Sequence, residues 1–134
     1  MQAVADTGLL KALLDRNDPY HPWAVEVFPK HVPWSTCEAV LTEAAHLSGA
    51  PRKVMELVAR CDLQVRFAAD AEAERLLELL GKYQDCRMDL ADACLVRMTE
   101  LDRAAVVFTL DRADFTVYRK HGSQPVPCVF PVAI

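Results

Sequence analysis

The chain has 134 residues, of which 52% are hydrophobic and 25% are charged, a composition typical of a globular protein. We therefore expect one domain over residues 1–134, long enough to bury a hydrophobic core. No apolar stretch reaches the ~18 residues that a membrane span requires, and the N-terminus lacks the basic and apolar regions of a signal peptide. The net charge of −4 argues against a broad basic surface for nucleic acid. An acidic cleft that holds a metal ion would still be able to meet a phosphate.

The five cysteines are scattered along the chain and show no zinc-type spacing. Their odd number also argues against a framework of disulfides. They fit small core residues of a reducing compartment, so we expect a cytoplasmic protein with no membrane partner.

In the first half of the chain, short strand patterns alternate with helical ones. Val4 and Ala5 predict the end of a buried strand, and a leucine repeat with a 3.6-residue period predicts a helix over 7–15. Asp18 followed by Pro19 predicts the start of a second helix, which stops near residue 29. After these come a strand at 31–34, a helix capped by Ser35 or Thr36 that runs to 48–49, and a helix from 51 to about 60.

The second half continues this alternation. Residues 63–67 alternate apolar and polar side chains, Asp70 can cap a helix that ends at Gly81, and Asp89 can start a helix that runs to 102. A continuous apolar run at 105–110 is typical of a strand covered on both faces, and a last short strand is predicted near 128–130. The alternation predicts an α/β protein, a three-layer α/β/α sandwich with a small, mainly parallel central sheet.

Four acids occur where burial should disfavour a charge. Asp6 and Asp111 directly follow predicted strands, whereas Glu43 and Asp92 lie inside apolar helical runs. Buried charges are normally paired or bound to a metal, and ligands of parallel sheets bind outside the carboxyl ends of the strands. We therefore expect these carboxylates to meet at that edge and to hold a divalent cation.

Neighbouring acids have simpler explanations. Glu38 suits the dipole of the first turn of its helix, whereas Glu43 shares the apolar stripe of that helix and is the better candidate. Asp89 is expected to cap the helix that carries Asp92, and Asp114 to satisfy backbone groups of its own loop. Asp89 and Asp114 therefore remain supporting candidates only.

Four short segments resemble PIN-domain proteins, also described as PilT N-terminus-like, in the same order along the chain. They are ADTGLL at 5–10 with DPYH at 18–21, VLTEAAHL at 40–47, MDLADA at 88–93 and FTLDRADF at 108–115. The resemblance implies a metal-dependent ribonuclease, most commonly the VapC-type toxin of a bacterial toxin–antitoxin pair. It carries the family's four-acid pattern onto Asp6, Glu43, Asp92 and Asp111, and a hydroxyl position onto Thr109. Positions 89 and 114 are also often acidic in similar sequences.

The predicted activity is an endoribonuclease that depends on Mg²⁺ or Mn²⁺. Oxygen-only ligands suit these hard cations, and Mg²⁺ usually binds one or two carboxylates and keeps several waters. We expect Asp6 and Asp92 to contact the ion directly, with Glu43 and Asp111 as supporting acids or ligands of a second ion. The sequence leaves the number of ions open.

The expected partners also follow from the resemblance, which implies an RNA substrate, a cognate antitoxin protein and a homodimer. The only local support for the dimer is an aromatic patch at Trp23 and Phe28, which lies either in the core or at a protein interface. Arg112, Arg119 and Lys120 are either phosphate contacts at the rim of the cleft or ordinary surface residues.

Three alternatives to a nuclease are considered from the sequence. Residues 6–8 read D-T-G, as in aspartic proteases, but the following leucines open a helix, which an all-β protease would not have. A receiver or phosphohydrolase domain would need an acid two positions from Asp6 and a lysine after a later strand, and neither is present. The third alternative is a non-catalytic PIN-fold module that binds RNA or protein, against which the four intact acids argue.

Overall fold

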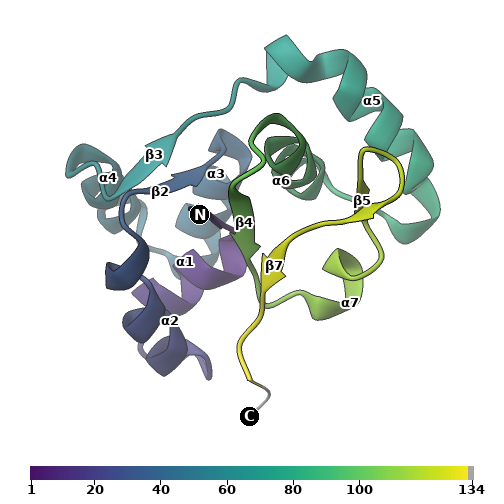
Figure 1. The fold of residues 1–134 in the computed structure, drawn as a ribbon. Helices are drawn as coiled ribbons and strands as arrows, with labels where there is room; N and C mark the ends of the chain where they lie inside the picture. The colour runs from purple at the N-terminus through teal and green to yellow at the C-terminus, as the bar shows by residue number, and fades with distance from the viewer. Residues whose placement is uncertain (133–134) are drawn as a thin grey trace.

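In a computed structural model, described here for residues 1–132, the chain folds as a central parallel sheet between layers of helices (Figure 1). Five parallel strands form the sheet in the order β3-β2-β1-β4-β7 within these residues. They are β1 (Gln2–Ala5), β2 (Trp34–Thr36), β3 (Leu63–Val65), β4 (Ala105–Phe108) and β7 (Cys128–Val129). The predicted α/β/α sandwich with a small parallel sheet is thereby confirmed.

Helices connect these strands and cover the sheet. The α-helices are α1 (Thr7–Leu14), α2 (His21–Val27), α3 (Glu38–Ser48), α4 (Pro51–Ala59), α5 (Ala73–Lys82), α6 (Leu90–Leu101) and α7 (Arg112–Phe115). Shorter 3₁₀ turns are η1 (Pro29–His31), η2 (Ala69–Glu72) and η3 (Gln84–Cys86), and a small hairpin pairs β5 (Arg119–Lys120) with β6 (Gln124–Pro125). None of the helices described is long and apolar enough to cross a membrane.

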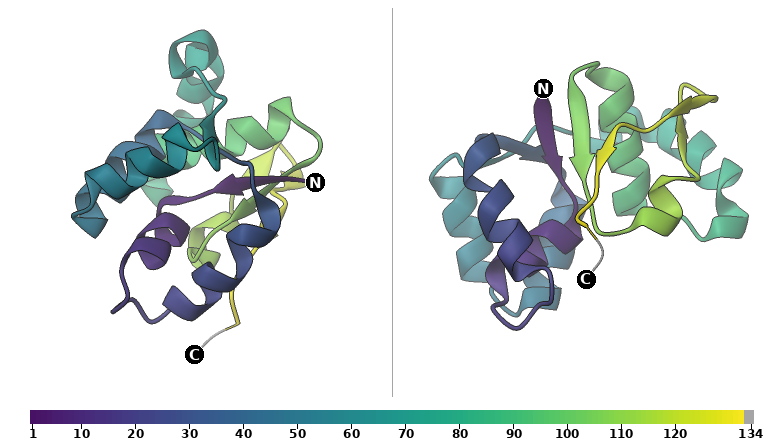
Figure 2. Two further views of the ribbon diagram at one scale, coloured as in Figure 1. Left: turned by 90° about the vertical axis from the view of Figure 1, so that its left-hand side faces the viewer. Right: turned by 60° about the horizontal axis from the view of Figure 1, so that its bottom comes forward.

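The strand order reverses next to β1, and this reversal creates the place for a site. From β1 the chain builds outward through β2 and β3, then returns on the other side of β1 through β4 and β7. Helices α1 to α4 accordingly gather beside β2 and β3, and α5 to α7 beside β4 and β7 (Figure 1). Strands β1 and β4 lie side by side and end at the same edge (Figure 2). Ligands of open parallel sheets bind in the crevice at such a switch point.

The core beside β2 is built around Trp34, which is fully buried. Its indole nitrogen donates to the carbonyl of Phe28 at 2.8 Å, and the two rings stack with centroids 5.4 Å apart. Phe28 is only 6% exposed, and Trp23 packs against the same core. The aromatic patch at Trp23 and Phe28 therefore belongs mainly to the core and does not support a homodimer.

Several predicted boundaries are wrong. Ser35 and Thr36 belong to β2, and α3 is preceded by Cys37, because the Thr36 hydroxyl donates to the Ala5 carbonyl at 2.8 Å and ties the two strands together. Gly81 lies inside α5 and does not end it, whereas Gly49, with φ of 66°, ends α3 as predicted. Tertiary contacts and not local propensity decide these ends.

A buried ion-pair network joins α5 and the β5–β6 hairpin to α6. Glu100 accepts two bonds from Arg75, at 2.7 and 2.9 Å, one from Arg97 at 3.2 Å and one from the backbone N–H of His121 at 2.7 Å. Burial alone would raise the pKa of Glu100, but these donors lower it to about 2. The network fixes the C-terminal segment against the helix that carries Asp92.

The cysteines are divided between core and surface. Cys37 and Cys94 are buried, and the Cys94 thiol lowers the pKa of Cys37. Cys61 and Cys86 are exposed, so the prediction that all five are core residues is wrong for these two. Cys61 lies in the turn after α4, and Cys86 is the last residue of η3.

Candidate functional site

The carboxyl ends of β1 and β4 open into an acidic cleft with a volume of about 310 Å³. All four predicted acids line this cleft, together with both supporting candidates, Asp89 and Asp114. The lining residues are Asp6, Thr7, Gly8, Lys11, Glu43, Leu47, Arg87, Asp89, Asp92, Leu110, Asp111 and Asp114. A larger groove of about 540 Å³ between α3 and α4 is mostly apolar. We therefore identify the candidate site by its converging carboxylates and not by the size of the cavity.

Asp6 lies at the base of the cleft because β1 ends one residue before it. The Ala5–Phe108 register of β1 and β4 places Asp6 next to Thr109. Its carboxylate accepts from the Thr7 backbone N–H at 2.7 Å, which caps α1, and from the Thr109 hydroxyl at 2.5 Å. Burial raises the pKa of Asp6 to about 6 against these hydrogen bonds, and the charges of Glu43 and Asp111 add to the rise.

Thr109 links two of the acids. It is completely buried, and while its hydroxyl donates to Asp6 it also accepts the backbone N–H of Asp111 at 3.0 Å. The hydroxyl position implied by the PIN resemblance is therefore a bridge between the acids that follow β1 and β4. Its geometry holds the Asp6 carboxylate and the Asp111 backbone in fixed relation.

Asp92 projects from the first turn of α6. Asp89 caps that helix, as predicted, by accepting the backbone N–H of Asp92 at 2.8 Å. The Asp92 carboxylate accepts from the phenol of Tyr118 at 2.8 Å. Burial is the main cause that raises the pKa of Asp92 to about 8, followed by the charge of Asp6 and then that of Asp89. The half-buried Asp92 is thus held where an uncompensated charge is unfavourable.

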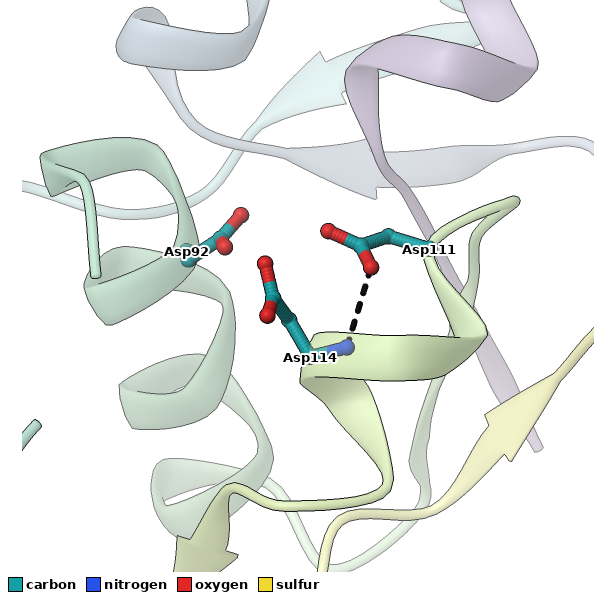
Figure 3. Close-up of side chains that lie close together, drawn as sticks. All are labelled: Asp92, Asp111 and Asp114. Carbon is teal, nitrogen blue, oxygen red and sulfur yellow. Dashed lines mark hydrogen bonds between the residues drawn. The ribbon is translucent and has the colours of Figure 1, made fainter. Parts of the chain in front are cut away.

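Asp111 and Asp114 face Asp92 across the cleft (Figure 3). Asp111 caps the short helix α7 by accepting the backbone N–H of Asp114 at 3.0 Å. One oxygen from each of Asp92, Asp111 and Asp114 lies within 4.8 Å of the other two. Burial, followed by the Asp111 carboxylate, raises the pKa of Asp114. The sequence ranked Asp114 as a supporting residue, and the geometry places it among the three closest carboxylates.

Glu43 reaches the cleft from α3. It is half-buried and close enough to Asp6 for its charge to raise the pKa of that carboxyl. Glu38, five residues earlier on the same helix, is exposed and lines the separate groove between α3 and α4. Glu43, and not Glu38, therefore lies in the acidic cleft, as the apolar stripe of the helix predicted.

The basic residues predicted at the rim are engaged within the chain. Arg112 and Arg119 donate to backbone carbonyls of their own C-terminal segment, and Lys120 donates to a carbonyl of α6. The cations that do line the cleft are Lys11 and Arg87. Lys11 pairs with acids of the α1–α2 turn, whereas Arg87 is exposed and makes no ion pair within residues 1–132.

This donor set fits a hard divalent cation. The potential ligands lining the cleft are carboxylates, with no histidine or cysteine among the lining residues. Oxygen donors of this kind suit Mg²⁺, Mn²⁺ or Ca²⁺ and do not suit soft metals. The raised pKa values of Asp6 and Asp92 record the repulsion and desolvation that a cation would relieve.

Sequence reasoning missed two residues of this site, Tyr118 and Arg87. Tyr118 is 26 positions from Asp92, and only the docking of the C-terminal segment on α6 brings them together. Arg87 has a left-handed backbone, with φ of 56°, which turns the chain between η3 and α6 toward the cleft. A basic residue two positions before a helix cap was the only signal in the sequence.

Comparison with known proteins supports the PIN resemblance. The chain is 27% identical over 126 aligned positions to Ribonuclease VapC26 of Mycobacterium tuberculosis (strain ATCC 25618 / H37Rv). The alignment covers 89% of this chain and 93% of that protein. No family model matches the chain.

Proposed function

We propose that this protein is a divalent-metal-dependent endoribonuclease, formed by a single PIN-like domain over residues 1–134, and that it is the toxin of a type II toxin–antitoxin pair. The observation that carries the proposal is the convergence of Asp6, Glu43, Asp92, Asp111 and Asp114 in one cleft at the switch point of a parallel sheet. The similarity to Ribonuclease VapC26 supports RNA as the substrate. The parallel α/β fold also argues against an aspartic protease, because the D-T-G motif of those enzymes lies in an all-β fold.

The role of each carboxylate would depend on its position in the cleft. Asp92, Asp111 and Asp114, whose oxygens approach most closely, would hold Mg²⁺ or Mn²⁺ together with Asp6, and Glu43 would support the site from α3. A bound divalent cation activates water for attack on a phosphodiester and neutralises the charge that develops on phosphate. Thr109 would keep the acids after β1 and β4 in register, so that little reorganisation is needed when RNA binds.

Arg87 is the proposed contact for an RNA phosphate. It is exposed at the cleft and is not neutralised by an ion pair within the described residues, whereas Lys11 is already paired with Asp15 and Asp18. A guanidinium can bind two phosphate oxygens at once, which would orient the backbone of RNA over the acids. This cation would give a chain of net charge −4 a local contact for RNA.

As a toxin, the protein would act on cytoplasmic RNA and be inhibited by a small antitoxin protein. A homodimer remains a proposal from the PIN resemblance, without support from the buried Phe28. Co-purification with the product of an adjacent small gene would test the antitoxin. Light scattering of the purified chain would measure the oligomeric state.

RNA cleavage tests the proposed chemistry. Wild-type protein should cleave RNA with Mg²⁺ or Mn²⁺, and excess chelator should abolish cleavage. Asp6→Asn and Asp92→Asn should each reduce the rate by a factor on the order of 10² or more, because each removes a charge that would hold the cation. Asp85→Asn, on exposed η3 and outside the cleft, is the matched control and should retain activity.

The outcomes separate the alternatives. If all three variants cleaved RNA as fast as the wild type, the assignment of Asp6 and Asp92 to the site would be wrong. Cleavage in excess chelator would contradict the metal requirement. Binding of RNA or of an antitoxin without cleavage under any divalent cation would favour the non-catalytic module.

A further inference from the structure

A buried tyrosine from the C-terminal segment holds one of the cleft carboxylates. Tyr118 is completely buried, and its phenol oxygen donates to Oδ2 of Asp92 at 2.8 Å. The two residues come from separate elements, since Asp92 lies on α6 and Tyr118 lies between α7 and β5. The hydrogen bond occupies one oxygen of Asp92 and restricts rotation of the carboxylate.

The position of Tyr118 is itself fixed by packing. Its ring meets the edges of Tyr83 and Phe115, with centroids 5.1 and 5.2 Å away. The following residue, Arg119, donates its backbone N–H to the Tyr83 hydroxyl at 2.8 Å. A rotamer held on two sides by aromatic rings can hold a hydrogen-bond partner in place at little further entropic cost.

Tyr118 is also joined to a second acid of the cleft. Its backbone N–H donates to the carbonyl of Asp114 at 3.1 Å. One residue therefore contacts both Asp92, through its hydroxyl, and Asp114, through its backbone. These two acids belong to the group whose oxygens lie within 4.8 Å of one another, so the spacing of that group depends on where Tyr118 sits.

We propose that Tyr118 is a positioning residue that orients the Asp92 carboxylate toward Asp111 and Asp114 for cation binding. The inference rests on the proposed metal-dependent function. Hydrogen bonds to ligating carboxylates fix their orientation, and their loss typically weakens metal affinity by about 10–100-fold. Tyr118 does not touch the reacting atoms, and its effect is exerted through Asp92.

The chain offers a matched control for this proposal. Tyr118→Phe removes the hydroxyl at Asp92 and keeps the ring, whereas Tyr83→Phe removes the hydroxyl at the Arg119 backbone from the same aromatic cluster. Mn²⁺ affinity is measured by calorimetry and by electron paramagnetic resonance, thermal stability by circular dichroism, and RNA cleavage by kcat and KM.

We expect Tyr118→Phe to weaken Mn²⁺ binding by about tenfold and to lower kcat, with the KM for RNA little changed. Tyr83→Phe keeps the ring that packs against Tyr118, so it should retain the Mn²⁺ affinity and kcat of the wild type. Equal Mn²⁺ affinity in wild type and Tyr118→Phe would overturn the proposal, as would an equal loss of affinity in both variants. Failure of the wild type to bind Mn²⁺ or cleave RNA would instead contradict the proposed function.

A crystal of the wild-type protein soaked in Mn²⁺ gives a test that needs no variant. The Tyr118 hydroxyl should remain within hydrogen-bond distance of Asp92 while the other side of that carboxylate contacts the ion. A Mn²⁺-bound structure in which Asp92 has turned away from Tyr118 would overturn the proposal.

Discussion

Replacing Asp92 by asparagine should make the folded protein more stable at high pH while weakening its site. The pKa of Asp92 is raised from 3.8 to about 8 in the folded protein, chiefly by burial and by the charge of Asp6. Between these two values the folded state binds more protons than the unfolded state, so the free energy of unfolding falls as pH rises. Asp6, with its pKa raised to about 6, contributes in the same direction over the lower part of this range.

The magnitude follows from the size of the shift. From pH 5 to pH 8 the unfolded carboxyl is ionised while the folded one is still largely protonated, which gives an upper bound of about 4 kcal/mol at ~1.36 kcal/mol per pH unit. Asp92 is only half-buried, so solvent screening should reduce the observed difference to about 1–2 kcal/mol. Asparagine can still accept the Tyr118 hydroxyl, so packing should be retained.

Urea denaturation at pH 5, 6, 7 and 8 in excess chelator measures this difference. The wild type should lose stability across the series, the variant should lose less, and the difference between the two should be smallest at pH 5. Added Mn²⁺ should stabilise the wild type at pH 8 more than it stabilises the variant. Parallel pH profiles for the two proteins would refute the reasoning that the cleft holds a destabilising charge.

Three further changes probe the site and its support. Asp114→Asn should weaken Mn²⁺ binding by a factor on the order of ten, measured by calorimetry, while Asp85→Asn should not, because only Asp114 lies in the carboxylate group. Arg87→Ala should raise the KM for RNA by about tenfold, with an unchanged melting temperature, since a lost phosphate contact is worth roughly 1–2 kcal/mol. Glu100→Gln should lower the free energy of unfolding by about 2 kcal/mol in urea denaturation at pH 7, because it weakens a buried ion pair. The contribution of Glu100 should be present above pH 4.5 and be lost as pH falls toward 2, so the two proteins should approach equal stability in acid.

The strand–helix alternation could be predicted from the sequence because the signals are local. The apolar run at 105–110 and the leucine period at 7–15 each depend on a few neighbouring residues. Both elements form, although β4 ends at Phe108 and α1 at Leu14. Boundaries set by contacts between distant segments were predicted less well. Thr36 was expected to cap a helix, but its hydroxyl bonds the carbonyl of Ala5, 31 residues away, which keeps it in β2.

The candidate site shows the same division. Four acids in apolar surroundings could be recognised along the chain, and the fold brings all of them to one cleft. The close approach of Asp114 to Asp92 and the hydrogen bond from Tyr118 could not be predicted, because both depend on how the C-terminal segment docks against α6. The Glu100 network that fixes this docking joins residues up to 25 positions apart and has no local sequence signature.

The most direct test of the acidic cleft is anomalous diffraction from wild-type crystals soaked in Mn²⁺. The account predicts an anomalous peak between the carboxylates of Asp92, Asp111 and Asp114, on the side facing Asp6, and loss of that peak in Asp92→Asn crystals soaked identically. Absence of a peak in the cleft, in crystals of a protein that cleaves RNA with Mn²⁺ in solution, would contradict the central claim that these acids form the metal site.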